Sequence, residues 1–146
     1  MTERQLSLAA ARSVCDAALS EAARRGLPVS AAVVDAGGNL VAFARMDGAE
    51  IAGVVLAPDK AYTAVANSTA THELAVVAAP GGPLFGLHAA AQGRYVIFGG
   101  GIPLRAAGRN GADGAIIGAV GVSGAPDPES DVACAAAGVA AWEESV

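Results

Sequence analysis

The sequence contains a single lysine, Lys60, and its position makes it the first candidate for chemistry. A helix is predicted to begin near Pro58, because proline fits a first helical turn, and Lys60 falls in that turn. There the ammonium would face the positive end of the helix dipole, which disfavours its charge. Such an amine could bind an anion or act as a base or nucleophile. The alternative is a solvated lysine that pairs with Asp59 or Glu50.

A second group of candidates lies at the ends of predicted strands. Arg45 could clamp a carboxylate through two hydrogen bonds, or it could pair with Asp47 and fix the loop. The run Gly99-Gly100-Gly101 could let a ligand approach the backbone or offer amides to an anion; the alternative is a tight strand connection. Tyr95 and Arg105 are candidates to line the same region. The sequence contains neither a GxxxxGK[ST] loop nor a GxGxxG fingerprint.

The two histidines are candidate ligands for iron but not for zinc. His72 and Glu73 resemble the start of a zinc-protease signature, but the required second histidine is replaced by Val76. That site is therefore excluded, and two histidines without nearby cysteines make a poor closed metal site. Either His72 or His88 could ligate haem iron, and the alternative for each is a surface or capping role.

Composition limits the class of protein. The 146 residues favour one domain, and the net charge of −5 without a basic patch argues against nucleic-acid binding. No apolar run is long enough to span a membrane, and no signal peptide is visible, so we expect a cytoplasmic protein. Only 16% of residues are charged and 53% are apolar, which predicts that partner subunits cover part of the surface. We therefore expect a homo-oligomer.

The elements that would position these candidates are helices and strands in a single domain, residues 1–146. In chain order we expect a helix over 4–25, strands over 29–35 and 40–45, a helix over 58–67, short helices over 71–79 and 86–92, strands over 94–98, 102–106 and 115–122, and a final helix from 128. Ala36-Gly37-Gly38-Asn39 predicts a hairpin turn, and a further turn is expected over 108–114. Asp127 is expected to cap the final helix, with Pro128 in its first turn. The fold class is α/β of the α+β type, with a largely antiparallel sheet.

Several segments, in their order and spacing, resemble the GlcG/HbpS family, which includes the C-terminal domain of PduO-type adenosyltransferases. These segments are Val33 to Leu40, Arg45 to Ala49, Lys60 to Ala64 with Thr63 among them, Gly99 to Pro103, and Ile117 to Gly124 with Asp127 to Asp131 after it. Within the last of them, Glu129 and Asp131 are interpreted as helix-start carboxylates. The resemblance covers about residues 4–141. It implies a five-stranded, mostly antiparallel sheet flanked by helices, assembly into dimers, tetramers or octamers, and haem or tetrapyrrole binding in some members.

Two functions remain open at this level. In the first, the oligomer binds haem, another tetrapyrrole or a small anionic metabolite in a pocket near Lys60. In the second, the chain is a cofactor-independent isomerase or lyase that acts on a small carbonyl or carboxylate compound, with Lys60 as base or amine. We favour binding.

Overall fold

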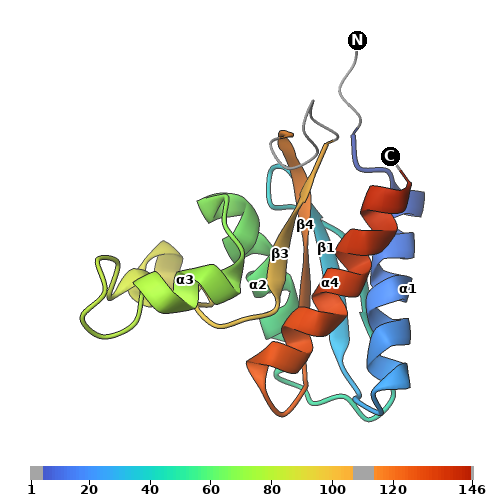
Figure 1. The fold of residues 1–146 in the computed structure, drawn as a ribbon, viewed down its shortest axis with the longest axis horizontal. Coiled ribbons are helices and arrows are strands. Elements are labelled where there is room, and N and C mark those ends of the chain that lie inside the picture. Colours follow the sequence, from blue (N-terminus) through green and yellow to red (C-terminus); the bar gives the residue numbers. More distant parts are fainter. Residues whose placement is uncertain (1–4, 107–113, 146) are drawn as a thin grey trace.

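The computed structural model describes residues 5–106 and 114–145, so most of the turn predicted over 108–114 lies outside the described residues. Figure 1 shows one sheet between two layers of helices. The elements are α1 (Leu8–Arg24), β1 (Ser30–Asp35), β2 (Leu40–Arg45), α2 (Gly53–Asn67), α3 (Thr71–Val77), the short 3₁₀ helices η1 (Leu87–Ala89) and η2 (Ala91–Gly93), β3 (Gly101–Arg105), β4 (Ile116–Ser123) and α4 (Pro128–Glu144).

The sheet has the strand order β2-β1-β4-β3, and every neighbouring pair in it is antiparallel. Helices α1 and α4 pack together on one face of the sheet, and α2 packs on the other face (Figure 1). The chain from α3 through the 3₁₀ helices projects away from the sheet on the α2 side (Figure 1). The α+β class and the antiparallel sheet are therefore confirmed, and the described residues form four strands instead of the five expected.

The two faces of the sheet are packed differently. The face beneath α1 and α4 has a core that includes Val14, Val33, Leu104 and Trp142, all of them buried. The face beneath α2 is packed most closely where Gly101 and Gly121 pair across β3 and β4 and face the helix backbone. Beside them lies a second, smaller core of Val34, Ala61, Ala64 and Ala119. A Cβ added to either glycine would overlap a carbonyl oxygen of α2. Glycine is thus required here for a close approach of helix and sheet.

Three predicted elements differ from the structure. The short helix predicted over 86–92 is instead the pair of 3₁₀ helices η1 and η2. The segment 94–98 is not a strand: the Val96 amide donates to Thr63 Oγ1 over 2.9 Å, and Arg94 forms an ion pair with Asp59. Side chains of α2 therefore form the hydrogen bonds with this segment that a neighbouring strand would otherwise form. Helix α2 begins at Gly53, five residues before Pro58, so this proline lies inside the helix and not in its first turn.

Candidate functional site

Lys60 lies in the middle of α2, and its side chain is completely buried. Its ammonium donates to the Val122 carbonyl oxygen and to Asp131 Oδ2, each over 3.0 Å, and lies 4.9 Å from the centre of the Phe98 ring. The expected first-turn position and the solvated alternative are both wrong, because α2 starts earlier and the side chain extends beneath Gly100. In this arrangement solvent does not reach the amine.

Asp131 is the partner that the sequence did not reveal. It lies in the first turn of α4, where an acidic residue suits the helix dipole, so it offers no signal of a second role. Its other oxygen, Oδ1, accepts a hydrogen bond from the Ala125 amide over 3.0 Å. Burial lowers the pKa of Lys60 and raises the pKa of Asp131, and in each case the charge of the partner opposes the shift. The pair joins α2, the end of β4 and the start of α4.

The glycine run closes over Lys60. Gly100 has a φ of 133°, and a Cβ at this position would lie 2.9 Å from Lys60 Nζ. The Gly101 amide donates to Thr71 Oγ1 over 2.9 Å, so this amide is already used within the chain. Thr63 is also engaged, since its hydroxyl donates to the Asp59 carbonyl oxygen and accepts from Val96. The structure thus brings Lys60, Gly100 and Gly101 together with Thr71 as a buried polar cluster, and Thr63 is buried one turn further along α2.

Tyr95 lies beside this cluster on an aromatic stack. Its ring packs on Tyr62 with the ring centroids 6.2 Å apart, and the Arg94 guanidinium lies 3.5 Å from the centre of the Tyr62 ring. The hairpin turn also contacts Tyr62, where Gly38 has a φ of 80° and leaves room for the ring. These contacts fix residues 94–98 against α2.

His72, Glu73 and His88 are exposed on the part of the chain that projects from the sheet. A Cβ built on Gly99, the residue after Phe98, would lie 3.3 Å from the Cβ of His72. The His88 and Phe85 rings are arranged edge to face, with their centroids 6.4 Å apart. This region also carries several large exposed apolar side chains, and we call it the projecting surface: Val76, Leu84, Phe85 and Phe98 together with the two histidines.

Three other predicted site residues lie apart from the buried cluster. Arg45 and Asp47 are exposed at the end of β2, on the far side of β1 from β4. Arg105 lies at the opposite end of β3 from Gly101 and donates to the Gly114 carbonyl oxygen over 3.3 Å. The structure does not bring these three residues together with Lys60.

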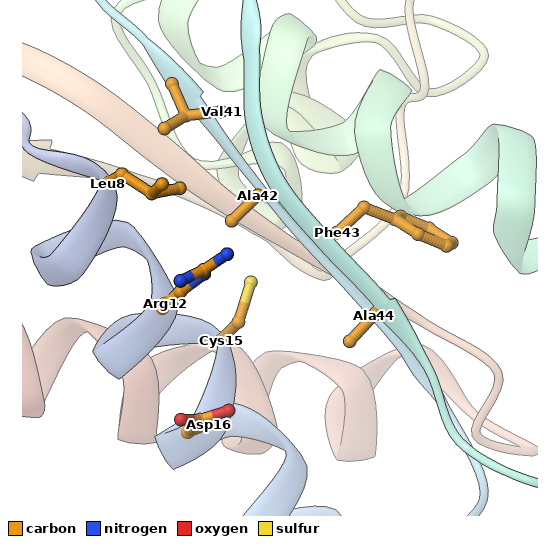
Figure 2. A pocket seen from close by; sticks show the side chains of 8 residues that line it. All are labelled: Leu8, Arg12, Cys15, Asp16, Val41, Ala42, Phe43 and Ala44. Atoms are coloured by element: carbon orange, nitrogen blue, oxygen red, sulfur yellow. The ribbon is translucent and has the colours of Figure 1, made fainter.

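A groove between α1 and β2 contains none of the predicted site residues. Its volume is about 370 Å³, and Figure 2 shows its lining: Leu8, Arg12, Cys15, Asp16, Val41, Ala42, Phe43 and Ala44. Burial raises the pKa of the Cys15 thiol to about 11, so the sulfur is a neutral part of the wall. Over residues 5–106 and 114–145, no group of three His, Cys, Asp or Glu side chains is placed to hold a metal ion. In the same ranges no helix is long and apolar enough to cross a membrane.

Residues 6–140 match the family model described as haem degrading protein HbpS-like. The corrinoid adenosyltransferase PduO of Salmonella typhimurium is 42% identical over 125 residues, which are 86% of this chain and 35% of PduO. The structure of a PduOC–haem complex is 40% identical with a TM-score of 0.85, over 94% of this chain and 95% of that one. A double mutant of Streptomyces reticuli HbpS is 35% identical with a TM-score of 0.81, over 96% and 88% of the two chains.

Proposed function

Because this chain belongs to the family of HbpS-like haem-degrading proteins, we propose that it is a small homo-oligomeric binding protein whose ligand is haem. One observation carries the proposal: a domain of the same fold and 40% identity has been solved in complex with haem. The chain covers only about a third of PduO, so the adenosyltransferase activity of that protein is no part of the proposal.

The projecting surface is the part of the chain whose residues fit haem. A macrocycle with a flat apolar face needs apolar contacts, and Phe85 and Val76 are 62% and 74% exposed there without a covering element among the described residues. Iron needs a nitrogen donor, and the exposed His88 imidazole lies beside the Phe85 ring. We propose His88 as the residue that would hold the iron. Bound haem would supply an iron centre, and His88 would donate a ring nitrogen to it.

His72 marks the other end of the projecting surface, over the buried cluster. Phe98 is 40% exposed on one side, while the Lys60 ammonium lies beneath its ring. A ligand that covered Phe98 would therefore lie close to Lys60 without touching its amine. In this proposal Lys60 supports the wall of the binding surface from inside the protein.

Titration of the purified protein with hemin tests this proposal. We expect a saturable shift of the Soret band in the unaltered chain, a changed spectrum and weaker binding in His88→Ala, and a smaller effect in His72→Ala. Gln92→Ala, an exposed neutral change in the same segment, is the matched control and should bind like the unaltered chain. Absence of a saturable Soret shift would reject haem as the ligand. Unchanged spectra in both histidine variants would reject histidine ligation.

A further inference from the structure

Strand β2 forms an edge of the sheet and has an unpaired row of backbone groups among the described residues. The Met46 amide donates to the Val29 carbonyl oxygen, and Ala44 and Ala42 pair with Ala31 and Val33 in the same ladder. Backbone direction alternates along the regular part of this ladder, so Phe43 and Arg45 present their N–H and C=O groups outward. The register shifts where Ala42 pairs with Val33 and Leu40 with Val34, so Val41 is the extra residue of a bulge at the end of this row. A further strand could bind to these groups.

The two edges of the sheet differ in how they are protected. At the β3 edge, the Val122 amide donates to the Gly100 carbonyl oxygen. Because backbone direction alternates along the strand, the backbone of Pro103 points away from β4, toward the open edge. Proline has no N–H, so it cannot donate a hydrogen bond to an added strand there. Strand β2 has the sequence LVAFAR, without proline or lysine, and Leu40 and Phe43 are 55% and 37% exposed. An apolar edge of this kind is a template for strand addition unless something covers it.

Helix α1 places a pair of opposite charges beside this edge. Arg12 and Asp16 are exposed, one helical turn apart, and line the groove at the level of Ala42 to Ala44 (Figure 2). Among the described residues neither of them forms an ion pair, not even with the other. Both charges are therefore available to a partner that docks along β2.

We propose that a second copy of this chain docks on β2 through a two-fold axis near Phe43, so that two four-stranded sheets become one eight-stranded sheet. The axis pairs Phe43 with its own copy, so that the outward N–H and C=O of this residue bond reciprocally across the axis, and it places Arg45 of each copy opposite the bulge at Val41 of the other. This interface is independent of haem binding and would exist in the protein without ligand.

The geometry on the α1 side fits a second copy of the chain. Helix α1 lies over both β1 and β2. With strands about 4.8 Å apart, the axis places the two α1 helices about 10 Å from each other, which is a normal helix packing distance. They run antiparallel, so Arg12 of each copy faces Asp16 of the other. A single chain thus carries both halves of a self-complementary charge pattern, as a two-fold interface requires.

The opposite face of the sheet contributes apolar contacts. Phe43 points to the α2 side (Figure 2), and the axis brings the two Phe43 rings together as a cross-strand aromatic pair. Near the start of α2 on the same face, Val54 and Val55 are 42% and 61% exposed. A disordered peptide could satisfy the backbone groups of β2, but it would not supply the reciprocal charges.

Disulfide capture tests the position of the axis. In Phe43→Cys, the two thiols would lie on a directly paired position with Cα atoms about 5.5 Å apart, which is within disulfide range. We expect mild oxidation to convert this variant to a covalent dimer on a non-reducing gel. The native Cys15 and Cys134 are buried, and Ala136→Cys on the exposed side of α4 is the control that should stay monomeric on that gel. An oligomeric protein in which Phe43→Cys fails to form the disulfide would overturn the proposal.

Charge reversal tests the α1 contacts by a separate measurement. Arg12→Asp and Asp16→Arg each place like charges across the axis, and sedimentation should show a dissociation constant raised by about tenfold or more. The double variant Arg12→Asp/Asp16→Arg restores the reciprocal pairs and should associate like the unaltered chain. Glu143→Arg on α4 is the control, and circular dichroism confirms the fold of each variant. A monomeric unaltered chain, or equal association of all four variants, contradicts the proposal.

Discussion

Replacement of Lys60 by methionine should destabilise the protein strongly, because it leaves the Asp131 carboxylate buried without its partner. The side chain of Lys60 is 0% exposed and that of Asp131 is 5% exposed, and their charged atoms are 3.0 Å apart. Removal of one member of such a buried pair costs about 3–5 kcal/mol. The free energy of unfolding of a domain of this size is roughly 5–15 kcal/mol, so Lys60→Met would remove a large share of the stability of the protein. For this chain length the midpoint of thermal unfolding should fall by roughly 10 °C or more.

Urea unfolding followed by circular dichroism measures this effect, and two further variants separate its cause. Lys60→Met/Asp131→Asn removes both charges, while the amide introduced in place of the carboxylate keeps an oxygen for the Ala125 N–H. The double variant should therefore be more stable than the sum of its single changes predicts. Arg94→Met breaks an exposed ion pair and a cation–π contact with the same helix and should cost about 1–2 kcal/mol, less than Lys60→Met. A loss below about 1 kcal/mol in Lys60→Met would refute the reasoning.

Two other predictions concern the glycine contacts and the cap of α4. Gly121→Ala should cost about 3 kcal/mol in urea unfolding, since its Cβ would lie only 2.0 Å from the Ala57 carbonyl oxygen. Gly138→Ala should cost less, because its Cβ would meet a Val14 methyl group and the Val14 carbonyl oxygen at 3.0 Å, where a small shift relieves the contact. Hydrogen bonds from the Ser130 amide and hydroxyl hold the pKa of Asp127 below its ordinary value of 3.8. This carboxylate therefore adds stability above pH 3.8 that is lost as the pH falls through the lower folded pKa. Asp127→Asn should reduce the loss of stability between about pH 5 and pH 3, and an unchanged pH dependence would contradict this assignment.

The elements that depend on local chemistry could be predicted from the sequence. The hairpin forms around Gly37 and Gly38, and Asp127 caps α4 by accepting a hydrogen bond from the Ser130 amide over 2.8 Å, as expected. Gly26, with a φ of 72°, follows the end of α1. These residues act on neighbours within a few positions, so their types alone determine the local structure.

The features that depend on distant residues could not be predicted. The segment 94–98 has the composition of a strand, but Thr63 and Asp59, more than thirty positions away, determine its backbone and side-chain bonds. Asp131, the partner of Lys60, is 71 positions away in the sequence. It lies in the first turn of α4, where an acidic residue is expected without any further role. Lys60 stands out in the sequence as the single lysine, but its burial follows from the packing of strands and helices and not from its sequence neighbours.

The close approach of α2 to the sheet has a mechanical consequence. Where Gly101 and Gly121 meet α2, backbone atoms beside the methyl groups of Ala57 and Ala61 make the contact, and such groups have no rotamers through which to adjust. A force applied at the projecting surface cannot be absorbed between α2 and β4, so helix and sheet must shift as one solid piece. Any deformation is then taken up on the thicker side, where larger side chains such as Trp142 and Leu104 can reorient.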